Sequence, residues 1–83
     1  MNIKDNIVNY LFDRDYVVCF YDEHAYFFNY KYLDSFKEQE IVVSLSDRRC
    51  TLRGEDLTIV KMTKKELLVK GRVDEMKVSM KDE

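Results

Sequence analysis

The residues best suited to chemistry are consecutive: Asp22, Glu23 and His24, of which His24 is the only histidine in the chain. An imidazole beside carboxylates could bind a metal ion or transfer a proton. Zinc, however, would need a further ligand such as a cysteine, which only the fold could supply. The same three residues separate two apolar, strand-like stretches. We therefore expect a solvated turn here and no metal site.

The two cysteines offer a second kind of chemistry, nucleophilic or redox. Cys19 and Cys50 are far apart in the sequence and lie outside any Cys-x-x-Cys motif, which favours reduced thiols over a disulfide framework. Cys19 lies between Val18 and Phe20, and Cys50 is two residues before Leu52, so Cys50 and Leu52 would point to the same face of a strand. We expect both cysteines to be small core residues without a catalytic role.

Phosphate and cofactor chemistry is limited by the glycine content. The 83 residues include two glycines, Gly54 and Gly71, and no proline. A P-loop needs two glycines close together before its lysine, whereas Gly54 and Gly71 are seventeen positions apart. A dinucleotide fingerprint needs three glycines, so neither motif can be formed. The serines lie in no Gly-x-Ser-x-Gly context. A chain this short also needs nearly all its large apolar residues for its core. We expect no enzyme activity, no cofactor and no small-molecule substrate.

The elements that must position these residues are mainly strands. Apolar and polar residues alternate with a period of two, or β-branched and aromatic residues cluster, in several short stretches joined by polar connections. Residues 30–37 fit a helical turn as well as a bent strand. The pattern predicts a mainly β fold, a small antiparallel β-sandwich or open barrel of six to seven short strands, over residues 16–21, 25–29, 41–45, 50–53, 57–61, 66–70 and 76–80.

The first 14 residues have a different period. Apolar residues recur there at spacings of three and four, which predicts a short N-terminal helix over residues 1–14, with an irregular arm as the alternative. Residues 15–83 form a single β domain in this interpretation. The chain has neither an apolar run near the ~18 residues of a membrane span nor the apolar segment of a signal peptide. We expect a cytoplasmic protein.

Each glycine follows an apolar residue and a basic residue, in Leu52-Arg53-Gly54 and Val69-Lys70-Gly71. We interpret both steps as the ends of strands. Glycine is the residue that tolerates positive φ, a bulge or a close backbone neighbour. Gly54 and Gly71 are therefore predicted to be structural turn or bulge positions.

Two clusters could bind partners. The aromatic residues between positions 16 and 36 have one basic residue among them, Lys31, so core packing is favoured over base stacking. Part of the aromatic cluster is expected to remain as a partner surface, formed by Tyr26, Phe28, Tyr30 and Tyr32. The densest basic set, within residues 61–72, suggests either the solvated side of a strand or a small nucleic-acid or polyanion-binding domain; it contains Lys61, Lys64, Lys65, Lys70 and Arg72. The net charge of −2 argues against nucleic acid.

The order of several motifs resembles the YabP/YqfC family of small sporulation proteins from spore-forming Firmicutes, over residues 16–80. The motifs are Asn29-Tyr30-Lys31 after a strand, Leu52-Arg53-Gly54 before Leu57 and Ile59, and Glu66-Leu67 in a strand that ends in Lys70-Gly71-Arg72-Val73. The chain departs from the family at Tyr21-Asp22-Glu23, where members often have a glycine.

The resemblance implies a β-sandwich-like domain made in the mother-cell cytosol during sporulation, beside membrane-associated sporulation proteins. It supplies no catalytic residues. We therefore expect a non-enzymatic protein that acts through protein–protein contacts with a membrane-associated sporulation partner. The alternating lysines of the last strand, Lys77 and Lys81, argue against uncontrolled edge pairing but leave a homodimer open.

Overall fold

The computed structural model describes Tyr10 and residues 13–81. Six antiparallel strands form one sheet in the order β1-β2-β6-β5-β4-β3, which confirms the mainly β prediction. The predicted helix over residues 1–14 lies almost wholly outside the described residues. The strands are β1 (Val17–Tyr21), β2 (His24–Phe28), β3 (Tyr32–Phe36), β4 (Glu40–Ser44), β5 (Arg48–Met62) and β6 (Glu66–Met80).

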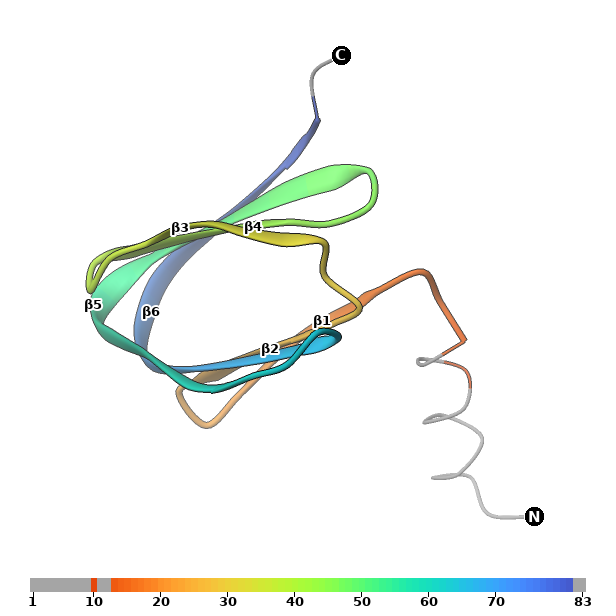
Figure 1. Ribbon diagram of the computed structural model, residues 1–83. Coiled ribbons are helices and arrows are strands. Elements are labelled where there is room, and N and C mark those ends of the chain that lie inside the picture. Colours follow the sequence, from red (N-terminus) through yellow and green to blue (C-terminus); the bar gives the residue numbers. More distant parts are fainter. Residues whose placement is uncertain (1–9, 11–12, 82–83) are drawn as a thin grey trace.

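The two longest strands form the frame of the sheet. β5 and β6 have 15 residues each, whereas the alternation pattern predicted two short strands in place of each. Only residues 66–70 of β6 pair with β2, and only residues 49–53 of β5 pair with β4. The long hairpin bends between these two regions, so that β1 and β2 face β3 and β4 across the interior (Figure 1).

Both glycines lie at this bend, inside the long strands and not at their ends. The ladder between β5 and β6 shifts register at Arg53/Gly54 and again between Glu55 and Thr58. A Cβ atom on Gly54 would lie 1.7 Å from the backbone oxygen of Arg72, closer than any side chain permits. Gly71 has a φ of 141°, and a Cβ atom there would lie 2.7 Å from the backbone oxygen of Asp56. Glycine therefore allows the two strands to approach while they bend.

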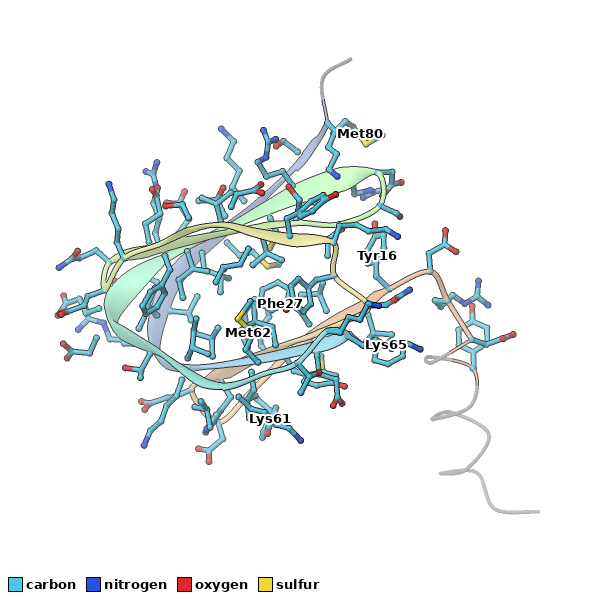
Figure 2. All side chains as sticks on the ribbon, viewed as in Figure 1. Tyr16, Phe27, Lys61, Met62, Lys65 and Met80 are labelled. Atoms are coloured by element: carbon cyan, nitrogen blue, oxygen red, sulfur yellow. The ribbon has the colours of Figure 1, made fainter. Side chains whose placement is uncertain are left out.

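The core occupies the space between the two layers. Inward-facing side chains of β2, β4, β5 and β6 fill it, with Phe27 near the centre (Figure 2). Its fully buried large side chains are Phe27, Ile41, Leu45, Leu52, Leu57, Leu67, Val43, Val69 and Cys50. Burial of these apolar groups is the main favourable contribution to folding.

Hydrogen bonds from two tyrosines join segments that are far apart in the sequence. The Tyr30 hydroxyl donates to the backbone oxygen of Thr63 at 2.7 Å, and the Tyr16 hydroxyl donates to Oδ1 of Asp47 at 2.9 Å. The backbone N–H of Lys81 also donates to the backbone oxygen of Asp47, at 3.2 Å. Residues just before β1 and just after β6 thus meet at the turn between β4 and β5.

His24, predicted to be part of the polar turn, is the first residue of β2, so the turn that joins β1 to β2 consists of Asp22 and Glu23. Their φ values are 44° and 59°, the left-handed conformation that a two-residue hairpin turn requires at both central positions. Aspartate tolerates this conformation better than most residues with a Cβ atom. The chain thus forms its first hairpin without the glycine common in the resembled family.

Candidate functional site

The second half of β6 has a strand neighbour on one side only. Its pairing with β2 ends at Lys70, and the backbone N–H of Gly71 makes a last contact with the backbone oxygen of Glu23 at 3.0 Å. Beyond that point residues 72–80 pair with β5, and no other described strand pairs with them. We call the gap between these residues and the β1–β2 hairpin the open seam.

Apolar side chains on the core face of β6 remain exposed along the open seam. Met76 and Val78 lie opposite Leu52 and Cys50 in the ladder, and opposed residues of antiparallel strands share a face. Leu52 and Cys50 are fully buried, yet Met76 is 39% exposed, Val78 46% and Met80 64%. The exposure arises because, among the described strands, only β5 lies beside this part of β6.

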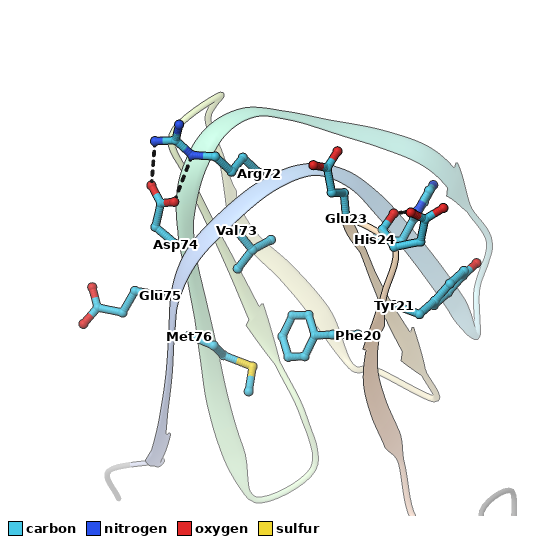
Figure 3. Close-up of a pocket in the computed structure, with 10 residues that line it drawn as sticks. Phe20, Tyr21, Glu23, His24, Arg72, Val73, Asp74, Glu75 and Met76 are labelled. Carbon is cyan, nitrogen blue, oxygen red and sulfur yellow. Dashed lines mark hydrogen bonds and ion pairs between the residues drawn. The ribbon is translucent and has the colours of Figure 1, made fainter.

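A hollow of about 450 Å³ lies at the Gly71 end of the open seam. Phe20 contributes from β1, where it lies opposite the buried Ala25 and so belongs to the core face, although it is 43% exposed. Figure 3 shows Phe20 and Met76 pointing into the hollow from the two sides, with Val73 beside them. The interior of the hollow is therefore apolar.

The rim of the hollow carries more acidic than basic groups. Arg72 donates to Asp74 Oδ1 at 2.9 Å and to Glu55 Oε2 at 2.6 Å. The hydrogen bond and charge of Asp74, followed by Glu55, raise the pKa of Arg72. The single rim guanidinium is thus already paired with carboxylates. The acidic residues that line the hollow are Asp22, Glu23, Asp74 and Glu75.

His24 lies at the edge of this hollow. Its ring stacks on Tyr21 with 5.2 Å between centroids, and its Nδ1 is 2.7 Å from the backbone oxygen of Asp22. Over Tyr10 and residues 13–81, no three His, Cys, Asp or Glu side chains group in a way that could hold a metal ion. Its stacking and backbone contact place His24 in the wall of the hollow.

The two cysteines differ in environment. Cys50 is buried, and desolvation raises the pKa of its thiol to about 11, which disfavours the nucleophilic thiolate. Cys19 is exposed, so its predicted place in the core is wrong. β1 is a margin of the sheet, and Cys19 lies opposite Tyr26 on the face away from the core.

The four aromatic residues predicted as a partner surface do not lie together. Tyr26 and Phe28 are half-buried on the outer face of β2, whereas Tyr32 is exposed on β3 at the far margin of the sheet. Tyr30 is buried and belongs to the core, where its hydroxyl reaches Thr63. Desolvation and a 2.6 Å hydrogen bond to Glu66 raise the pKa of Tyr26.

The basic set also divides. The four lysines are exposed, on β5, on β6 and in the turn between these strands; they are Lys61, Lys64, Lys65 and Lys70. Figure 2 shows Lys61 and Lys65 at separate places along the lower layer. Arg72 lies past the bend with its carboxylate partners. The described set therefore does not form a continuous stripe.

Sequence reasoning missed the open seam. It predicted a half-buried strand over residues 76–80 and took Phe20 as part of the aromatic core. One available signal was the pair of methionines, Met76 and Met80, because flexible thioethers recur at binding surfaces.

Among Tyr10 and residues 13–81, no helix is long and apolar enough to cross a membrane. Searches of curated proteins and of solved structures found no match. The YabP family model, in contrast, matches residues 14–83, nearly the whole chain, including every strand of the sheet. This chain belongs to the YabP family.

Proposed function

We propose that this chain is a non-enzymatic, sporulation-associated protein of the cytosol that acts by contact with a membrane-associated protein. Membership of the YabP family suggests a role related to sporulation. The observation that carries the proposal is the open seam, where Phe20, Met76 and Val78 lie on the core face of the sheet but remain exposed. Exposed apolar surface with a polar rim is typical of protein contact sites.

The state of the polar groups around the hollow supports contact over catalysis. Arg72 is paired with Asp74 and Glu55, and His24 stacks on Tyr21. A catalytic site needs a nucleophile or a base aimed at a place for the substrate. Arg72 and His24 instead contact neighbouring side chains at the rim, and the interior of the hollow is apolar.

The chemistry of the hollow also suggests the kind of partner. Its apolar interior and acidic rim would suit a segment that carries apolar residues next to lysine or arginine. Such segments occur where transmembrane helices enter the cytoplasm, because loops on that side are rich in Lys and Arg. We therefore expect the partner to insert an apolar residue beside Phe20 and to place a basic residue near Asp22 or Glu75.

A photo-crosslinking amino acid at position 20, in the chain expressed in sporulating cells of a spore-forming host, would test the proposal. We expect a crosslink to a membrane-associated sporulation protein, and no such crosslink from the same group at position 32, since Tyr32 is exposed at the far margin of the sheet. The Phe20→Glu variant should fold, lose the partner and lower spore yield as deletion of the gene does. Normal spore yield with Phe20→Glu would overturn the proposal.

A further inference from the structure

The outer half of β6 presents an unpaired strand edge. β2 occupies this edge as far as Lys70, but beyond Gly71 the described chain offers it no strand partner. An unpaired edge exposes backbone N–H and C=O groups that can pair with another strand. Proteins protect such edges with proline or with charged side chains, especially lysine. This chain has no proline, and its edge carries Lys77 and Lys81. The edge is therefore open to β-strand addition by a strand that matches the charges of these lysines.

The side chains of this edge sort by face. Met76, Val78 and Met80 lie on the inner face, opposite Leu52, Cys50 and Arg48 in the ladder. The side chains between them lie on the outer face, opposite Arg53, Thr51 and Arg49 in the same ladder; they are Glu75, Lys77 and Ser79. Continued alternation gives Lys81 the same outer face. One face of the edge is thus apolar and the other is charged or polar.

We propose that a second copy of this chain pairs with the edge in antiparallel orientation, about a two-fold axis at Val78. Each Met76 then lies opposite Met80 of the second copy, and Val78 lies opposite its own counterpart. On the outer face, Glu75 lies opposite Lys81 and Lys77 opposite Ser79. This pairing sets apolar groups against apolar groups and opposite charges against each other, which stabilises antiparallel strands.

Neighbouring registers are worse matched. Centring the axis on Lys77 sets two copies of Lys77 against each other, and centring it on Ser79 sets Lys77 against Lys81. Centring it on Met76 sets Val78 against Asp74. A shift by one residue in only one copy would place inner side chains opposite outer ones. Charge and face together therefore select the axis at Val78.

The inference rests on the proposed function, because both place protein contacts at the open seam, and it deepens that function by naming one partner. The two contacts are centred on different parts of the seam but share Glu75 and Met76, which belong both to the self-pairing edge and to the lining of the hollow. From these two residues the hollow extends towards Phe20 and Val73 near Gly71, and the self-pairing edge extends to Lys81.

Sedimentation equilibrium of the full chain over a range of concentrations tests the dimer. We expect reversible association at micromolar concentrations, with Val78→Arg monomeric because two guanidinium groups would meet at the axis. Val60→Arg is the matched control, since Val60 is a valine of similar exposure, 52% against 46%, on β5. A parent chain that stays monomeric, or a Val60→Arg variant that loses association as Val78→Arg does, would overturn the inference.

A charge exchange tests the register. Glu75→Lys and Lys81→Glu should each weaken association severalfold, since each sets like charges together twice in the symmetric dimer. The double variant Glu75→Lys/Lys81→Glu should recover the parent dissociation constant, and failure to recover would contradict the axis at Val78. If the chain is monomeric but still crosslinks from position 20 to a membrane-associated protein, the self-pairing is refuted and the proposed function stands. If the chain dimerises but gives no such crosslink, the proposed contact with a membrane-associated protein is refuted and the self-pairing stands.

Discussion

The two halves of β6 carry the same sequence pattern but have different surroundings. Leu67 and Val69 alternate with polar or half-buried neighbours and are fully buried, whereas Val78 and Met80 alternate in the same way and are largely exposed. The first half lies between β2 and β5, and β5 is the one described strand that pairs with the second half. Alternation thus reports the face on which a side chain lies, while the neighbouring strands decide whether that face is covered.

The largest expected effect concerns the bend that separates the two halves. Gly54→Ala adds a Cβ atom that would meet the backbone oxygen of Arg72 at 1.7 Å. Backbone cannot yield as a flexible side chain can, so we expect a loss of more than about 4 kcal/mol in the free energy of unfolding, which is a large part of the stability of a small domain. Circular dichroism and urea unfolding would measure this loss. A variant within about 1 kcal/mol of the parent would show that the bend does not depend on Gly54.

Two valines of β6 allow a direct comparison of its halves. Val69→Ala removes two methyl groups from a fully covered site and should cost about 2 to 3 kcal/mol in the free energy of unfolding. Val78→Ala removes the same groups from an exposed site and should cost less than about 1 kcal/mol. Urea unfolding at low protein concentration, where self-pairing does not contribute, measures both. Equal costs would mean that the second half is covered in solution.

Alkaline pH sharpens the comparison at Cys50, which lies opposite the exposed Val78 but is itself fully buried. Burial raises the pKa of its thiol from 9.0 to about 11. The folded state therefore keeps a proton that the unfolded state releases, so the free energy of unfolding falls as pH rises from about 9 to 11, by roughly 2 to 3 kcal/mol.

The parent should lose more stability than Cys50→Ala when urea unfolding of the two is compared between pH 8 and 11. The loss that remains in Cys50→Ala includes that of Tyr26, whose pKa is also raised and which both proteins share. Cys19→Ala serves as the control because Cys19 is exposed, and it should follow the parent. A Cys50→Ala variant with the same pH dependence as the parent would place Cys50 in contact with solvent through the open seam.

The smallest expected effect concerns the covered part of the molecule. Tyr30→Phe removes the hydrogen bond from the buried tyrosine to the backbone oxygen of Thr63 and should cost about 1 to 2 kcal/mol in the free energy of unfolding. The exposed bond from Tyr16 to Asp47 should cost less when Tyr16→Phe removes it. Thermal unfolding of both variants decides the order. A larger loss for Tyr16→Phe would mean that the junction at Asp47 is the more stabilising of the two.

The sequence was sufficient for the local features of this fold. Period-two alternation predicted strands at the positions of β1, β2, β4, β5 and β6, whereas residues 30–37, which contain β3, fitted a helical turn as well as a bent strand. A turn was predicted at Asp22, Glu23 and His24 because these residues interrupt two apolar stretches, and two of the three form it. The length of β5 and β6 could not be predicted, because a glycine after an apolar strand reads equally as an end or as a bulge. Only the backbone contact between Gly54 and Arg72 shows that the strand continues.

The candidate site was less accessible to sequence reasoning. Phe20 and Met76 are exposed because the described strands leave the second half of β6 with β5 as its neighbour. Which strands become neighbours is a non-local property that the pattern of residues along one strand does not reveal. For the same reason Tyr30 was expected at a surface although its side chain is buried, and Cys19 was expected in the core although β1 is a margin of the sheet.

The strand order also has a consequence for the course of folding. Every pairing in the sheet joins strands adjacent in the sequence except that of β2 with β6, which brings together residues some 40 positions apart, such as Phe27 and Leu67. Pairings that close long loops form late and slow the folding of β proteins. During synthesis the first hairpin must therefore wait, with Ala25 and Phe27 uncovered, until the ribosome has released residues 66–70. Aggregation of nascent chains should be most acute in that interval.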